Sequence, residues 1–350
     1  MDVRTLTSPT DYDTAWADLN NALKTTEIAQ GFAAAIAGLQ ANQHGTGFIK
    51  DPLTGVKRYT FRHPDDPSRF FRVQFNAMRM ARFNGAGLSV PPEGIEIVHG
   101  GCYLCRENVA WQQEGRELGF EVIVNGMHYN AWMNPFPLMP CHVVMASAMH
   151  ETQDWSFAPG GGQDVSRLIG DLTALASLLP GYLGFHNGVD AGASIAGHLH
   201  FQFFQRPADM PDFPLEINLA GKHPEGDAPV FTTDYPLPAV KWCGPAKSVT
   251  KAAAAWINDW ARRNGERTYR LTANIIATTT DDGMVTLYFV PRDRSKSRGH
   301  GLSGQIGGLE VLGELVFASP HDRELIEKGK INYFAIEEIL ASVRTPLFID

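Results

Sequence analysis

One strand-like segment constrains the fold of this chain more than any other. Residues 198–204, HLHFQFF, alternate polar and apolar side chains, which is the period of a β-strand. Successive side chains of a strand point to opposite faces of the sheet, so His198, His200 and Gln202 share one face. The leucine and phenylalanines between them share the other face and are suited to a core. We therefore expect a sheet that is apolar on one side of this strand and polar on the other.

A glycine-rich loop precedes the strand. Residues 187–197, NGVDAGASIAG, contain three glycines and a serine, so the backbone can bend and direct several N–H groups to one point. Such a nest binds phosphate without positively charged side chains. Two histidines on a strand face also occur as ordinary half-exposed residues. Here their alternation with a glutamine, directly after the loop, favours a site for an anion.

A second cluster is Cys102 and Cys105 in the segment GGCYLC. A Cys-x-x-Cys pair is typical of a zinc knuckle or of a redox pair, and it also occurs by chance. A redox pair begins a helix within a βαβ unit, a context that this sequence does not predict. A zinc site needs two further ligands, for which His142, His150 and His198 are candidates.

The distribution of elements predicts an α+β fold. Helical periodicity covers residues 14–42 and 164–180, and runs such as Phe120–Val124 and His142–Ala146 are typical of strands. A further amphipathic helix and a hairpin that turns at residues 282–283 follow in the last third of the chain. Strands joined by hairpins, together with a long helix, indicate an antiparallel sheet with helices packed on it.

We expect four segments along the chain. Residues 1–95 form a helix and hairpin extension that packs on the core, and residues 96–206 form the catalytic domain. Residues 207–235 are rich in Pro, Gly and Asp, as a linker is, and residues 236–350 form a C-terminal lobe. The helix and hairpin of this lobe resemble those of the middle segment but have no His-x-His, which suggests a degenerate duplication.

Composition excludes several classes of protein. The formal net charge is −8 at pH 7, whereas general nucleic-acid binding needs a basic surface. Residues 1–19 contain acidic side chains and no apolar segment, so we expect no signal peptide. No apolar run approaches the ~18 residues of a membrane span. Four cysteines in 350 residues do not make a disulfide framework. We expect a cytoplasmic protein without nucleic-acid or membrane partners.

Three segments together resemble the histidine-triad (HIT-like) superfamily: NPFPLMPCHVVMASAMHETQ, FHNGVDAGAS and HLHFQ. The similarity is to the branch whose motif ends in Gln, His-x-His-x-Gln. This branch includes galactose-1-phosphate uridylyltransferase, diadenosine tetraphosphate phosphorylase and the GDP-hexose phosphorylases. The similarity is clearest over residues 98–206 and greatest to a bacterial subgroup, so it does not identify the substrate. It implies a HIT-like antiparallel sheet with packed helices and a degenerate second HIT-like lobe.

The resemblance implies roles for the motif residues. His200 corresponds to the nucleophile that attacks the α-phosphorus of a nucleotide and becomes a covalent nucleotidyl-imidazole. Gln202 would donate its amide N–H to phosphate oxygens. Because an amide cannot transfer a proton, the Gln goes in this branch with transfer to an acceptor phosphate instead of hydrolysis. Asn187, Gly192 and Ser194 match the loop that holds the phosphate, with the Gly and Ser about one position from the uridylyltransferase pattern.

The resemblance also implies a metal site. The zinc ligands of this branch correspond to Cys102, Cys105, His150 and His198, a choice that prefers His150 to His142. Four protein ligands leave no open position, so this zinc would be structural. We expect no organic cofactor.

Further residues are candidates for contact with the substrate. Asn134 and Phe136 match a segment that contacts the nucleoside in relatives, although an ordinary turn between prolines would have the same sequence. Arg79 and Arg292 are candidates for phosphate contacts, although arginines at strand ends are commonly solvated.

These features together predict a nucleotidyltransferase or phosphorylase. Its substrate would be a nucleoside-diphosphate sugar or a dinucleoside polyphosphate, and its acceptor would be phosphate or a sugar phosphate. A nucleotide hydrolase and a non-catalytic nucleotide-binding protein are the alternatives. The chain would be a monomer or a homodimer, because a C-terminal lobe can supply within one chain what a second subunit supplies in single-lobe relatives.

Overall fold

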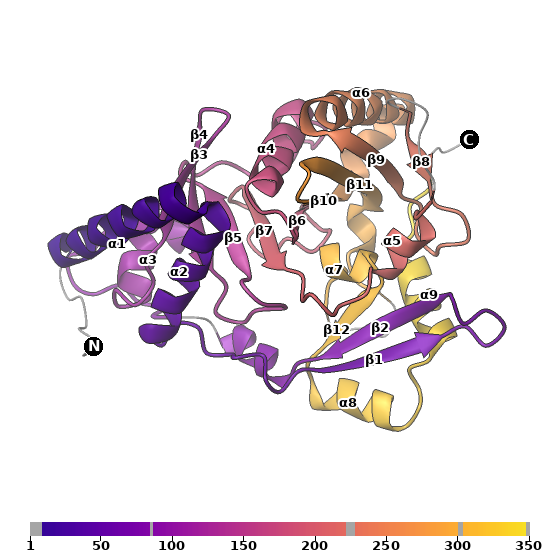
Figure 1. Cartoon of the computed structure of the whole chain (residues 1–350), viewed down its shortest axis with the longest axis horizontal. Helices are drawn as coiled ribbons and strands as arrows, with labels where there is room; N and C mark the ends of the chain where they lie inside the picture. The colour runs from indigo at the N-terminus through magenta and orange to yellow at the C-terminus, as the bar shows by residue number, and fades with distance from the viewer. Residues whose placement is uncertain (1–8, 85–86, 222–227, 300–303, 348–350) are drawn as a thin grey trace.

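A computed structural model describes residues 9–84, 87–221, 228–299 and 304–347 of the chain. These residues form a nine-stranded and a three-stranded sheet with helices packed on them (Figure 1). The large sheet has the order β3-β4-β5-β7-β6-β10-β11-β9-β8, and its neighbouring strands are antiparallel. The predicted α+β fold with an antiparallel sheet is therefore confirmed.

The strands of the large sheet are β3 (Phe120–Val124), β4 (Met127–Met133), β5 (Val143–Ser147), β6 (Tyr182–Asn187), β7 (His200–Gln205), β8 (Val230–Phe231), β9 (Val240–Pro245), β10 (Leu271–Thr279) and β11 (Met284–Asp293). Those of the small sheet are β1 (Lys57–Arg62), β2 (Phe70–Phe75) and β12 (Glu314–Phe317). The α-helices are α1 (Pro9–Gln30), α2 (Phe32–Gly45), α3 (Arg106–Gln112), α4 (Val165–Ser177), α5 (Pro214–Asn218), α6 (Ala246–Asn264), α7 (Gly308–Val311), α8 (Pro320–Glu327) and α9 (Tyr333–Ser342). Short 3₁₀ turns are η1 (Ala77–Asn84), η2 (His99–Gly101), η3 (Gly265–Arg270) and η4 (Arg294–Lys296).

The helix predicted over residues 14–42 is two helices, α1 and α2. They meet at Gly31, whose φ of 92° is a conformation that residues with a Cβ rarely adopt. The helix predicted over residues 164–180 is α4. Its N-cap is Asp164, whose side chain accepts a hydrogen bond from the backbone N–H of Arg167.

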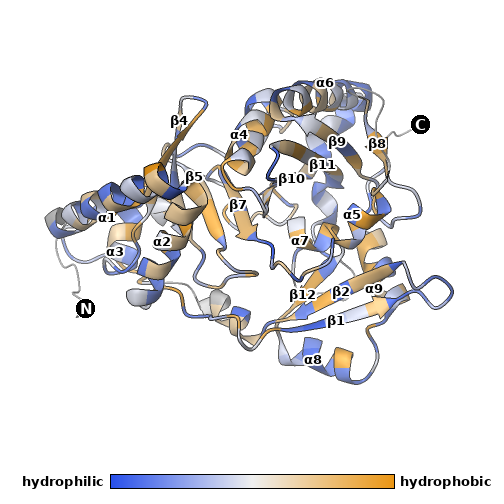
Figure 2. Ribbon diagram, in the orientation of Figure 1, coloured by the Kyte–Doolittle hydropathy of each residue, from blue (hydrophilic) through white to orange (hydrophobic). Residues whose placement is uncertain are grey.

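One face of the large sheet carries the main apolar core. Helices α2, α4 and α6 pack on this face, with Ile36, Leu172 and Ile257 among their fully buried residues. The phenylalanines of β7 on this face, Phe201 and Phe203, are equally inaccessible. The colouring in Figure 2 shows the apolar character of β5 and β7, in contrast to the hydrophilic β1. The apolar half of the alternating HLHFQFF segment thus builds the core.

The opposite face carries two separate apolar clusters. One contains Trp16 and Trp132 near helix α3, and the other contains Phe204 together with residues of α5, α7, α9 and the small sheet. His200 and Gln202 also lie on this face. Their partners across the β5–β7 pair belong to the first cluster, and Phe204, on the same strand, belongs to the second. The polar half of the alternating segment therefore lies where the two clusters adjoin.

The small sheet combines two strands from the N-terminal part of the chain with one from the C-terminal part. Strand β1 pairs antiparallel with β2, and the C-terminal strand β12 pairs parallel with β2. Glu314 on β12 is fully buried, and its carboxylate forms ion pairs with Nε of Arg58 at 3.0 Å and Nε of Arg72 at 3.3 Å. Figure 1 shows this sheet beside helices α8 and α9.

The large sheet runs through both the middle and the C-terminal segments of the predicted division. Strand β6 pairs with β10, so residues 96–206 and 236–350 share one sheet. Residues 207–235, predicted as a linker, include α5 and β8, and β8 pairs with β9. The division into four segments remains a prediction. No helix in the described ranges combines the length and the apolar character needed to cross a membrane.

Candidate active site

Strand β7 carries two residues of the motif, His200 and Gln202, at the centre of the candidate site. Its cross-strand pairs with β5 are Ala146 opposite His200 and Val144 opposite Gln202. Because His200 and Gln202 are two residues apart on one strand, their side chains project from the same face. His200 is only 3% exposed and Gln202 is half-buried.

The ring of His200 is fixed in one tautomer. Its Nδ1 lies 2.8 Å from the backbone carbonyl oxygen of His198, so Nδ1 carries the proton and donates it to that oxygen. The lone pair is then on Nε2, at the far side of the ring. Burial lowers the pKa of His200 to about 4, although the hydrogen bond to His198 opposes this effect. The imidazole is therefore neutral and nucleophilic at pH 7.

His142 fixes the amide of Gln202. The backbone N–H of Leu138 donates to Nδ1 of His142 at 3.1 Å, so the proton of this ring is on Nε2. Nε2 then donates to Oε1 of Gln202 at 2.9 Å. Because Oε1 is the acceptor, the NH₂ group of Gln202 is left as a donor for another ligand. Burial, aided by the positive charge of Arg79, lowers the pKa of His142 to about 3, so this arrangement holds throughout the neutral range.

Acidification below about pH 6.5 is expected to destabilise the protein. His142 and His186 have pKa values of about 3 in the folded chain, because both are buried, against an ordinary value of 6.5. Between these values the unfolded chain binds protons that the folded chain does not, so the free energy of unfolding falls as the pH falls. Thermal unfolding followed by circular dichroism between pH 7 and 5 measures the slope. The variant His142→Phe should have a lower Tm but a flatter slope, and equal slopes in the two proteins would contradict the assignment.

The glycine-rich loop is held against the C-terminal part of the chain. Oδ1 of Asn187 accepts hydrogen bonds from Nδ2 of Asn274 and from the backbone N–H of Gly308, each at 2.8 Å. Gly192 has φ 98°, and a Cβ at this position would lie 2.5 Å from Cα of Gly307. The loop therefore requires glycine here both for its backbone angle and for its close approach to residue 307. Ser194, which was expected to contribute to phosphate binding, is exposed.

Arg292 lies behind this loop and is fully buried. Its Nη1 donates to Oδ1 of Asn274 at 2.8 Å and to the carbonyl oxygen of Ile306 at 2.6 Å, and its Nη2 donates to that of Lys296 at 3.2 Å. Burial lowers the pKa of Arg292 to about 10, so it remains charged at pH 7. In this structure Arg292 orients Asn274, which in turn holds Asn187.

The segment from Asn134 to Leu138 lies beside the motif and is held by the N-terminal part of the chain. Oδ1 of Asn134 accepts from the N–H of Phe136 at 2.9 Å, which makes a local turn. Arg79 donates to the carbonyl oxygen of Phe136, and Gln74 donates to that of Leu138 at 2.7 Å. Phe136 and Arg79 are both buried. Arg79 thus supports the segment that was predicted to contact the nucleoside.

Four residues from three parts of the chain form a candidate metal centre. The donor atoms of Cys102, Cys105, His150 and His198 all lie within 4.8 Å of one another. Nδ1 of His198 is 3.3 Å from Sγ of Cys102 and 3.6 Å from Sγ of Cys105, and Nδ1 of His150 is 3.3 Å from Sγ of Cys105. Zinc bonds of about 2.3 Å to sulfur and 2.0–2.1 Å to nitrogen at tetrahedral angles separate such atoms by about 3.6 Å. The donor set therefore fits a metal such as zinc.

Hydrogen bonds and ring stacking orient the side chains of these candidate ligands. Nε2 of His198 donates to the carbonyl oxygen of Ser147 at 2.7 Å, which leaves the lone pair on Nδ1, toward the cysteines. The ring of His99 stacks on that of His150 with centroids 4.1 Å apart. Burial and the adjacent Cys102 raise the pKa of Cys105 to about 12, so a bound metal would displace its proton. Since the carbonyl of His198 also orients His200, this centre and the nucleophile share one residue.

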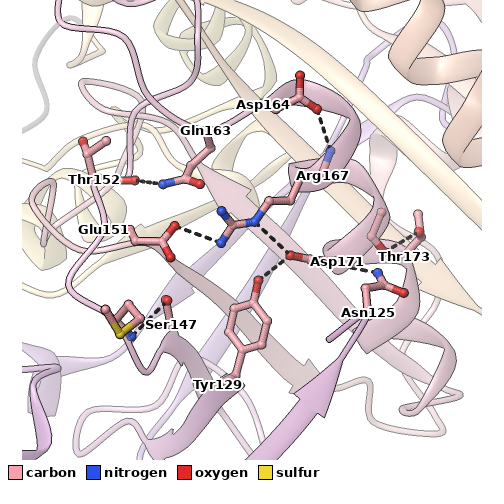
Figure 3. Close-up of polar contacts among 12 residues, drawn as sticks. Asn125, Tyr129, Ser147, Glu151, Thr152, Gln163, Asp164, Arg167, Asp171 and Thr173 are labelled. Carbon is pink, nitrogen blue, oxygen red and sulfur yellow. Dashed lines mark hydrogen bonds and ion pairs between the residues drawn. The ribbon is translucent and has the colours of Figure 1, made fainter. Parts of the chain in front are cut away.

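A charged network holds Glu151, the residue that follows His150 in the chain (Figure 3). Glu151 forms an ion pair with Arg167 at 2.8 Å, and Arg167 also faces the buried carboxylate of Asp171 at 3.7 Å. Asp171 accepts from the hydroxyl of Tyr129 at 2.6 Å and from Asn125 at 2.9 Å. Helix α4 and strand β4 thereby anchor the segment that follows β5.

Two kinds of comparison place this architecture among known proteins. Yeast Ap4A phosphorylase Apa2 in complex with AMP superposes with a TM-score of 0.57 and 17% identity, over 88% of this chain and 96% of that one. Its complex with Ap4A gives a TM-score of 0.56 and 17% identity, over 89% and 97% of the two chains. The chain shares the fold of yeast Ap4A phosphorylase. Residues 47–205 also match a family described as a domain of unknown function (DUF4922), and no curated protein matches the sequence.

In this Ap4A phosphorylase fold, several residues that support the motif had no signal in the sequence. The sequence indicated His142 only as a candidate metal ligand that ranks below His150, and the direction of its hydrogen bonds depends on the turn after Leu138. Asn274 and Gly308 lie far along the chain from Asn187, which both contact. A contact over such a separation becomes visible only when β6 is seen to pair with β10.

Proposed function

We propose that this chain is a nucleotidyltransferase or phosphorylase that acts through a covalent nucleotidyl-His200. The observation that carries the proposal is the neutral ring of His200, whose Nδ1–H is tied to a backbone carbonyl beside the oriented amide of Gln202. Its substrate is a nucleoside-diphosphate sugar or a dinucleoside polyphosphate. The yeast protein of the same fold, named for its action on Ap4A and solved with AMP and with Ap4A, supports a nucleotide substrate.

The first step is an in-line displacement at the α-phosphorus. The lone pair on Nε2 of His200 forms a P–N bond, and the bond from phosphorus to the bridging oxygen breaks. The leaving group is a sugar phosphate or a nucleoside polyphosphate, which takes the bonding electrons. Asn187 and the loop that follows it would direct backbone N–H groups to the phosphate, and Gln202 would donate to a non-bridging oxygen.

The second step reverses the first with a different nucleophile. An oxygen of inorganic phosphate or of a sugar phosphate attacks the α-phosphorus, and the P–N bond breaks. His200 regains its neutral ring, and the product is a nucleoside diphosphate when phosphate is the acceptor. Gln202 has no proton to exchange with water at neutral pH, which favours a phosphate acceptor over hydrolysis.

We further infer that the metal centre binds zinc. Zinc accepts four ligands of nitrogen and sulfur in a tetrahedron, and Cys102, Cys105, His150 and His198 are such a set. With four protein ligands the ion would contribute to structure. The chain's own residues perform the transfer, and His198 connects the centre to the nucleophile through its carbonyl oxygen.

Phosphate dependence tests this proposal. The purified protein is incubated with UDP-, GDP- and ADP-sugars and with diadenosine tetraphosphate, each with and without inorganic phosphate, and nucleotides are separated by chromatography. We expect at least one substrate to yield a nucleoside diphosphate only when phosphate is added, or a new nucleoside-diphosphate sugar only when a sugar phosphate is added.

The other outcomes contradict the proposal. Release of a nucleoside monophosphate at equal rates with and without phosphate would identify a hydrolase. Nucleotide binding in a thermal-shift assay without turnover of any substrate would identify a non-catalytic binding protein.

A further inference from the structure

Gln153 lies between the phosphate-binding loop and the nucleophile. It belongs to the segment after β5 that also carries His150, and its side chain is fully buried. Nε2 of Gln153 donates to the carbonyl oxygens of Asn187 at 2.8 Å and of His200 at 3.1 Å. Oε1 accepts from the backbone N–H of His200 at 2.7 Å. One carboxamide thus contacts both candidate parts of the reaction centre.

The side chain of Gln153 lies where strands β6 and β7 no longer pair with each other. Strands β6 and β7 pair as far as Phe185 opposite Gln202. Beyond that point, Asn187 on β6 pairs with Asn274 on β10, and His200 on β7 pairs with Ala146 on β5. A carboxamide offers two donors and an acceptor, so it can take the place of the missing contacts between strands. Without it, buried polar groups of the backbone would lose their partners.

The backbone around Gln153 is itself held on several sides. Its N–H donates to the carbonyl oxygen of Ala196 at 3.2 Å, and its own carbonyl accepts from Nε2 of His186 at 3.2 Å. Two residues earlier, the carbonyl of Glu151 accepts from the N–H of Leu199. The ion pair of Glu151 with Arg167 in Figure 3 ties the same segment to α4. The backbone that carries the carboxamide of Gln153 is therefore held in place.

We propose that Gln153 is a positioning residue that sets the separation between His200 and the loop beginning at Asn187. This inference rests on the proposed function, because it concerns the geometry of transfer between a phosphate held by the loop and the nucleophilic ring. A displacement of either partner lengthens the distance between Nε2 of His200 and phosphorus in the bound complex. In-line transfer is sensitive to displacements of about 1 Å, which reduce rates by as much as ~100-fold.

The test compares two buried glutamines of one segment. Gln153→Leu keeps the size of the side chain and removes its three hydrogen bonds to the site. Gln163→Leu is the matched control, because Gln163 is also buried and its Nε2 donates to the carbonyl oxygen of Thr152 at 2.9 Å, within the same segment, and not to His200 or Asn187 (Figure 3). We expect Gln153→Leu to lower the single-turnover rate of nucleotidyl-His200 formation at least ~10-fold with little change in KM. Gln163→Leu should retain the wild-type rate, and a wild-type rate in Gln153→Leu would overturn the inference.

A second variant and a measurement without substrate keep the test decisive. Gln153→Glu retains an acceptor for the N–H of His200 but places a second carboxylate oxygen against the carbonyl oxygens of Asn187 and His200, so its rate should fall at least as far as that of Gln153→Leu. Hydrogen exchange of peptides covering residues 199–202 should be faster in both variants than in the wild type and in Gln163→Leu. A wild-type protein without transferase activity would refute the proposed function, whereas unchanged exchange in both Gln153 variants would refute the positioning role.

Discussion

Replacement of His200 by alanine is expected to abolish nucleotidyl transfer, with a loss of at least ~1,000-fold in kcat, as is found when a nucleophile is removed. The physical reason is that the neighbouring groups proposed to bind the phosphate offer no neutral lone pair on the same face of β7. With a substrate labelled in its α-phosphate and a denaturing alkaline quench, the wild-type protein should carry label on His200. The variant should carry none, and its affinity for AMP should stay close to that of the wild type.

His186 supplies the matched control for this prediction. It is 2% exposed against 3% for His200, but it lies on the other face of the sheet, where its ring contacts Phe201 of the main core. His186→Phe should lower the Tm and slow labelling of His200 without abolishing it, because the variant loses only the hydrogen bond from Nε2 of His186 to the carbonyl oxygen of Gln153. Full turnover in His200→Ala, or label on another residue in the wild type, would exclude the covalent mechanism.

Removal of the metal is expected to produce the largest change in stability. Structural zinc contributes on the order of 10 kcal/mol to the folding of small zinc domains. In a protein of this size, each kcal/mol shifts the Tm by roughly 1–2 °C, because the entropy of unfolding grows with chain length. We therefore expect chelation, or the variant Cys105→Ser, to lower the Tm by more than ~10 °C and to remove activity in parallel, because His198 orients His200.

Two further measurements complete this experiment: the metal content of the purified protein and the effect of replacing a cysteine outside the centre. Elemental analysis of the purified protein should find about one zinc per chain, since four ligands from one chain complete a tetrahedral site. Cys243→Ser should change neither metal content nor Tm, because Cys243 is exposed and lies on β9, outside the centre. A protein that is free of metal, fully active and insensitive to chelators would show that the four residues have another role.

The alternation of residues along β7 could be predicted from the sequence because it depends only on local geometry. A strand must send Phe201 and Phe203 to one side and His200 and Gln202 to the other, and the structure has this arrangement. The strand predicted at residues 142–146 is also present, shifted by one residue to Val143–Ser147. The fold class followed from such local patterns together with the resemblance.

The environment of Arg292 could not be predicted, because it depends on the order of strands in the sheet. The sequence shows an arginine at the end of a hairpin strand, a position that is commonly solvated. In the structure β10 lies between β11 and β6, and Arg292 is enclosed where it bonds to Asn274 and to backbone carbonyls. Periodicity reports which face of a strand a residue occupies, but not which elements later cover that face.

The position of Gln153 illustrates the same limit at the site itself. The residue belongs to the HETQ segment that contributed to the resemblance, yet neither its spacing nor its type indicated that it would reach His200 and Asn187. Its partners are backbone groups, which leave no mark in a sequence. Residues that act through main-chain contacts are therefore identified only from the folded structure.

The parallel pairing of β12 with β2 has a consequence for biosynthesis. A chain that leaves the ribosome N-terminus first has Arg58 and Arg72 available early, but their carboxylate partner, Glu314, is translated 256 residues after Arg58. Contacts between residues so distant along the chain are slow to form. The hairpin β1–β2 should therefore reach its final position last, and so should Gln74, which donates to the carbonyl oxygen of Leu138. Nascent chains halted before β12 should therefore bind nucleotides poorly even though every motif residue has already been translated.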